Sequence, residues 1–136
     1  NMNNEPLGSY ERNIMKTKIE VMVIFLEARA DVAMKEKKIT LEHISESEIL
    51  SSGTMDYVIE MDAKYYASKF ALNHLKSIIE GGEFYDELES DEMIKVLRDR
   101  IMYEITRGYE AKSTSPSSNH IQNARHFSMI NLLNEI

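Results

Sequence analysis

The sequence predicts an all-helical domain, and three features of its 136 residues indicate this. It contains only two prolines and five glycines, and both prolines lie outside the segments with helical periodicity. In those segments, apolar residues recur at spacings of three and four, whereas no segment shows a convincing strand pattern. Five helical segments of unequal length are expected within one domain, residues 1–136. This favours globin-like or irregular bundle packing over a regular four-helix bundle.

The first expected helix runs from Gly8 to about Lys38 and carries an unbroken apolar run, Val21 to Leu26, at its centre. A helix that is apolar on every side for nearly two turns must also be covered on every side. A chain of this length cannot wrap a helix in several layers of its own. We therefore expect a second subunit or an apolar ligand to supply part of the cover.

Cap and break residues predict the next two helices. Thr40 is a plausible N-cap for a short helix over Leu41 to Ser51. After a break at Gly53, Thr54 is expected to cap a long helix, and Gly81-Gly82 to end it in a left-handed conformation.

The last two helices follow from similar signals. Ser90 is a candidate N-cap for a helix whose apolar face includes Leu97 and Ile101. The stretch Lys112 to Ser118 is rich in serine and predicts a loop. The final helix is expected over Asn119 to Asn134.

Composition excludes several classes of protein. The chain has no cysteine, which rules out disulfides and thiol nucleophiles and favours the cytoplasm. A formal charge of -7 and a pI near 5.1 disfavour binding to nucleic acid. The longest apolar run is far shorter than the roughly 20 residues that a membrane span requires. A soluble protein is expected.

The residues offer little for catalysis or metal binding. No two of the four histidines stand three or four apart, so no metal site is expected. Phosphate loops, nucleophile elbows and di-iron motifs are absent, and we do not expect an enzyme. His74 is the best candidate for a haem ligand, but a helix-flank histidine is the preferred interpretation.

Two features suggest a ligand cavity. Nine methionines fit either a pliable cavity or ordinary core packing. Arg98 lies on the flank of an apolar helix face, where it could meet a carboxylate or a halide, or form a salt bridge with Asp62 or Asp99. Tyr65 and Tyr66 could place a hydroxyl at a cavity mouth.

Three segments of the chain carry a family resemblance: Tyr10-Glu11-Arg12-Asn13-Ile14-Met15, the long helix through Val21 to Leu26, and Tyr65-Tyr66-Ala67-Ser68-Lys69-Phe70. On these segments the chain resembles the plasmid-encoded sporulation-inhibitory proteins of bacilli, which are similar to the sensor domain of a sporulation histidine kinase. The resemblance covers nearly the whole chain.

This resemblance implies a homodimeric globin fold without haem, which encloses a fatty acid in an apolar tunnel and binds an anion such as chloride. With 136 residues there is no room for a phosphoacceptor helix pair or an ATP-binding domain, so a sensor without a transmitter is expected. The implied function is that of a decoy, which inhibits sporulation by competing with a sensor histidine kinase for its signal. The alternative is a helical dimer that docks onto a kinase without any ligand.

The helical faces, rather than a motif, suggest the binding residues. Three polar side chains are candidates for the ligand carboxylate, in the order Arg98, Tyr66, His74. The expected tunnel lining is Met22, Phe25, Leu26, Met61, Tyr65, Phe70, Leu72, Leu97 and Ile101.

Overall fold

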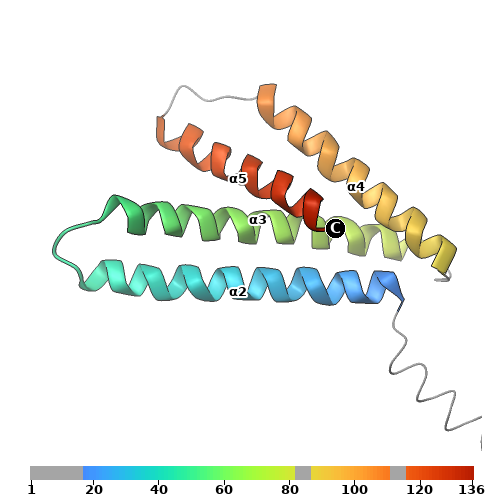
Figure 1. Cartoon of the computed structure of the whole chain (residues 1–136), viewed down its shortest axis with the longest axis horizontal. Helices are drawn as coiled ribbons and strands as arrows, with labels where there is room; N and C mark the ends of the chain where they lie inside the picture. Colours follow the sequence, from blue (N-terminus) through green and yellow to red (C-terminus); the bar gives the residue numbers. More distant parts are fainter. Residues whose placement is uncertain (1–16, 82–86, 111–115) are drawn as a thin grey trace, which may run out of the picture.

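The computed structural model describes residues 17–81, 87–110 and 116–136, and every regular element in them is an α-helix. The helices are α2 (Lys18–Glu46), α3 (Ser52–Glu80), α4 (Glu87–Glu110) and α5 (Pro116–Glu135). The expectation of an all-helical fold is therefore confirmed. Helices α2 and α3 lie side by side and run in opposite directions, while α4 and α5 pack on the other side of α3 (Figure 1).

Helix α2 begins after Thr17, whose hydroxyl accepts a hydrogen bond from the backbone N–H of Glu20 at 3.2 Å. It continues to Glu46, so the expected end at Lys38 and the separate short helix over Leu41 to Ser51 are wrong. The hydroxyl of Thr40 donates to the carbonyl of Glu36 at 2.8 Å, one turn earlier. This bond satisfies Thr40 inside a helix, so the residue does not act as a cap. The expected start at Gly8 lies outside the described residues.

The boundaries of α3 also differ from the prediction. Ser51, rather than Thr54, occupies the N-cap position, and Gly53 lies inside the first turn. The helix ends at Gly81, but this glycine has a φ of -83° and is right-handed, so the expected left-handed stop is wrong at this residue. Gly82 lies outside the described residues.

The last two helices both begin earlier than predicted. Ser90 lies inside α4 and is fully buried, so it is not an N-cap. Helix α5 begins at Pro116, a residue suited to a first helical turn because its missing N–H is not needed there. The final helix is thus confirmed, and residues 116–118 of the expected loop are helical.

The core lies around α3, which packs against all three other helices. Two small residues, Ala67 and Ala71, are fully buried and allow close approach to α3. The large buried residues around α3 belong to one core cluster. Burying one large aliphatic side chain contributes about 1.5–3 kcal/mol, so this core cluster dominates the stability of the fold. The large residues with no exposed surface are Leu26, Leu75, Leu97, Ile101 and Leu132.

Candidate functional site

Helix α2 has two apolar faces, and the described part of the chain covers only one of them. The covered face includes Ile19, Leu26, Ala30 and Ala33, all buried. On the opposite side, no other described helix lies against α2 (Figure 1). Exposed residues recur there at alternating spacings of four and three, a pattern typical of helix pairing. We call this set the α2 stripe: Val21, Phe25, Ala28, Val32, Lys35 and Ile39.

The exposure of the α2 stripe is substantial. Val21 is 53% exposed, Val32 58% and Ile39 38%. The apolar run near the start of α2 is therefore not covered on every side by the described residues. Within that run, Leu26 alone is buried.

An apolar groove of about 470 Å³ adjoins one end of the α2 stripe. Its apolar lining comes from α2, α4 and the end of the chain, and the charged groups beside it are Lys18 and Glu135. The volume lies within the range of small-molecule sites. The apolar lining residues are Val21, Met22, Phe25, Ile94 and Ile136.

Two of the predicted tunnel residues, Met22 and Phe25, line this groove. The cation beside it is Lys18, which forms an ion pair with Asp91 at 2.8 Å. Lys18 was not predicted, because a single lysine within a helical segment gives no sequence signal for ligand binding.

Four other predicted tunnel residues pack together in the core. Leu26, Leu72, Leu97 and Ile101 are at most 2% exposed and belong to one cluster. Met61 is also buried. In this structure these side chains contact protein, so any role in ligand binding stays a prediction.

Arg98 belongs to α4, and its guanidinium lies against the C-terminal end of α5. Its Nη1 donates to the backbone carbonyls of Leu133 at 3.0 Å and Ile136 at 2.7 Å. The carbonyls of a last helical turn have no partner within the helix, and a cation complements them. The contacts of Arg98 are thus with backbone rather than with Asp62 or Asp99, and Ile136 places it beside the groove.

His74 and Phe70 lie together in a different hollow, beside α4. Their rings are 4.4 Å apart, and Nη1 of Arg100 lies 3.3 Å from Nδ1 of His74. A guanidinium only donates, so this Nδ1 accepts and the imidazole is neutral in this pair. Burial first, and then the charge of Arg100, lower the pKa of His74 below its usual 6.5.

Tyr66 lines a third hollow, between α4 and α5. The guanidinium of Arg125 lies 4.7 Å from the centre of its ring, a cation–π distance. Arg125 also pairs with Asp62 at 3.4 Å, and Lys37 pairs with the same carboxylate at 2.8 Å. Burial acts to raise the pKa of Asp62, but these two cations outweigh it and lower that pKa. Tyr65 is half-buried.

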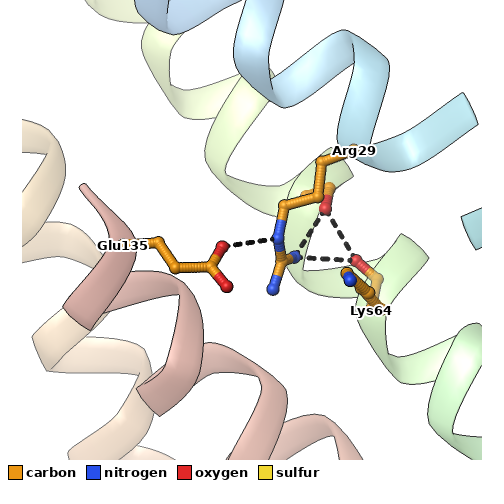
Figure 2. A network of polar contacts seen from close by, with 4 residues as sticks. Arg29, Lys64 and Glu135 are labelled. Carbon is orange, nitrogen blue, oxygen red and sulfur yellow. Dashed lines mark hydrogen bonds and ion pairs between the residues drawn. The ribbon is translucent and has the colours of Figure 1, made fainter. Parts of the chain in front are cut away.

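A buried arginine that joins three helices was not predicted from the sequence. Nε of Arg29 on α2 donates to Oε2 of Glu135 on α5 at 2.9 Å (Figure 2). Its Nη1 donates to the hydroxyl of Ser68 at 2.7 Å and to the carbonyl of Lys64 at 3.3 Å, both on α3. The side chain of Arg29 is 7% exposed and that of Glu135 45%. Periodicity could not reveal Arg29, since it lies between the apolar faces of α2.

Arg29 forms part of the wall of the polar hollow, a space of about 610 Å³ between α3 and α5. Lys64 and Glu135 line the same space, together with serine and asparagine side chains of α5. Helix α5 runs in the same direction as α3 here, since Asp56 lies 3.4 Å from His120 and Asp62 pairs with Arg125 further along. The polar hollow thus extends along both helices.

Comparisons with known proteins gave no assignment: no family model, no curated protein and no solved structure matches this chain. Among the described residues, no group of three histidine, cysteine, aspartate or glutamate side chains could bind a metal ion. In the same residues, no helix combines the length and apolar character needed to cross a membrane.

Proposed function

We propose that this protein is a non-catalytic binding module that carries a fatty acid in the groove beside α2 and acts as a sensor-domain decoy. In this role it inhibits sporulation by competing with a sensor histidine kinase for its signal, in the cytoplasm. The observation that carries the proposal is the unpartnered apolar surface of α2 and the groove that continues from it. The decoy role, the globin-like arrangement without haem and a bound chloride rest on the resemblance alone.

The chemistry of the groove suits a single acyl chain. Its wall is mainly apolar, and each methylene transferred from water into such a wall contributes about 0.8 kcal/mol before ordering costs. The ammonium of Lys18 lies beside it and can meet the carboxylate in place of Asp91. Arg98 also lies close to the groove, because it donates a hydrogen bond to the carbonyl of Ile136, a lining residue.

A second copy of the chain is the partner that fits the α2 stripe. Val21 and Phe25 belong to both the stripe and the groove lining, so a helix packed on the stripe would also cover the groove. An open groove would then become an enclosed tunnel. Antiparallel pairing is favoured, because a parallel pair would place the two Lys35 ammonium groups opposite each other.

The extent of the α2 stripe favours a second candidate function. The stripe continues to Ile39, well beyond the groove, and repeated apolar positions of this kind are typical of helix–helix contacts. In this alternative the protein is a helical dimer that docks onto a kinase and carries no ligand.

The test combines extraction with mass measurement. Purified protein is denatured and extracted with organic solvent, and the extract is analysed by mass spectrometry against a mock purification. Palmitate uptake by delipidated protein is then measured by calorimetry, and the mass in solution by light scattering. A fatty acid in the extract, palmitate uptake and a dimer mass are the results expected.

Three matched variants separate the two sites. Ile94→Asp in the groove should lower palmitate affinity by about tenfold or more, because it puts a carboxylate beside the acyl chain. Val32→Asp on the stripe should split the dimer, and Val96→Asp, a 40% exposed valine on α4, should do neither. A dimer that takes up no palmitate would refute fatty-acid binding and leave the docking protein. A monomer unaffected by Val32→Asp would refute the stripe as an interface.

A further inference from the structure

We propose that the polar hollow around Arg29 is a second binding site, which takes a small zwitterion of short-peptide size with its carboxylate on Arg29. Glu135 lines both this hollow and the fatty-acid groove, but the two spaces suit ligands of different chemistry, and nothing in the proposed function requires the second site. Its starting point is Arg29, whose side chain is 7% exposed and lines one end of a space of about 610 Å³.

The hydrogen bonds of Arg29 leave one edge of the guanidinium incompletely used. Nη1 is committed to α3 through Ser68 and Lys64, whereas Nε meets a single oxygen of Glu135. Nη2 has no hydrogen-bond partner among the described residues (Figure 2). Because Nε–H and Nη2 lie on the same edge, they form the fork that binds both oxygens of a carboxylate.

Glu135 behaves as a replaceable carboxylate at this edge. It lies at the last residue of α5, and its side chain is 45% exposed, so it can leave Arg29 without disturbing the core. A ligand carboxylate can then accept from both Nε and Nη2. Exchanging one carboxylate for another keeps the buried charge of Arg29 paired, which avoids the large cost of isolating it.

The charges along the hollow define the rest of the ligand. Asp56, Glu60 and Lys64 stand at intervals of four on one face of α3, and all three line the hollow. The carboxylates of Asp56 and Glu60 therefore line one part of the hollow, and the cations of Lys64 and Arg29 line the other part. From Asp56 to Lys64 the helix advances about 12 Å. An extended tripeptide spans about 10 Å, which matches a carboxylate at Arg29 and an ammonium near the acids.

The side walls are suited to a peptide as well. Ile59, Ala124 and Phe127 give an apolar patch for a side chain, while Asn131 and Asn134 offer amides to a peptide backbone. Phe127 is 65% exposed, so an apolar side chain packed on it would remove surface from water.

The test is an NMR titration of the 15N-labelled protein with the tripeptide Ala-Leu-Ala. We expect saturable shifts at Arg29 and along the facing parts of α3 and α5. Amidation of the peptide carboxylate should weaken binding by about tenfold, the effect of losing a charge-assisted pair, and N-acetylation by severalfold. Equal affinity for the free and amidated peptides, or an absence of saturable shifts, would overturn the site. Equal affinity for the N-acetylated peptide would overturn the zwitterion.

Two variants with a matched control test Arg29 itself. Arg29→Lys should weaken Ala-Leu-Ala about tenfold, because an ammonium cannot form the fork. Glu135→Gln removes the competing charge, preserves the shape and should tighten binding by severalfold. Arg107→Lys, at an exposed ion pair on α4, should leave the affinity unchanged. If Glu135→Gln weakens binding or leaves it unchanged, Glu135 is not displaced and the proposal fails. Ile94→Asp should not alter peptide binding, so this site and the fatty-acid groove can fail independently.

Discussion

Replacing Leu97 with alanine distinguishes a packed core from a ligand tunnel at the centre of this fold. Leu97 has no exposed surface and shares a cluster with Leu26, Leu72 and Leu132, one from each of the other helices. Leucine-to-alanine changes at such positions cost about 2.7–5.0 kcal/mol, depending on how far the walls relax. Walls from four helices relax little, so we expect a loss of about 3–4 kcal/mol.

The loss should appear as a large shift in thermal unfolding followed by circular dichroism. A domain of this length has an unfolding entropy of roughly 0.29 kcal/mol/K, so the melting temperature should fall by about 10–14 °C. Leu50→Ala is the control, since Leu50 is 60% exposed between α2 and α3, and it should change stability by less than about 0.5 kcal/mol. If Leu97→Ala costs under about 1 kcal/mol and lowers palmitate uptake, Leu97 lines a ligand space and the core assignment is refuted.

Two further predictions concern pH and helix propensity. Burial and Arg100 lower the pKa of His74, so just below pH 6.5 the unfolded chain binds more protons than the folded chain does. The contribution of His74 to stability is therefore present above pH 6.5, and it is lost as the pH falls through 6.5 toward the lower folded-state pKa. His74→Gln should therefore reduce the fall in melting temperature between about pH 7.5 and 5.5 relative to the wild type, and the exposed-site control His43→Gln should not; equal pH dependence of both variants would contradict this. Gly108→Ala should raise the free energy of unfolding by about 0.5 kcal/mol in urea titrations, because alanine favours the helix and its Cβ would lie 3.4 Å from Nδ1 of His126, an acceptable distance. Gly108→Leu should instead destabilise the protein, because the larger side chain would collide with His126. Equal stability of the two variants would argue against that contact.

The sequence predicted the helical class and much of the core because both follow from local periodicity. Leu97, Ile101 and Leu72 stand on the apolar faces that the spacing identified, and all are buried. Boundaries were less predictable, since a residue such as Thr40 or Ser90 can either cap a helix or bond within one. The choice depends on packing with neighbouring helices, which the local sequence does not contain.

The polar contacts were largely unpredictable because they join residues far apart in the chain. Arg29 and Glu135 are 106 positions apart, and Arg98 meets carbonyls at the end of α5 rather than a carboxylate. Helical faces identify which side chains are apolar, but not which hydrogen bonds a buried cation makes. The hollow at Arg29 could therefore be found only from the fold.

The apolar run on α2 keeps much of its surface exposed within the described part of the chain. A run from Val21 to Leu26 requires cover on all sides, yet Val21, Ile24 and Phe25 remain 53%, 50% and 37% exposed. Leu26 on the opposite face is fully buried, so this face of α2 packs against the core while the other face stays exposed among the described residues. The uncovered side chains form a regular stripe that leads into an apolar groove, and scattered exposure would not produce that order. This order is the reason for proposing that a second copy and an acyl chain supply the missing cover.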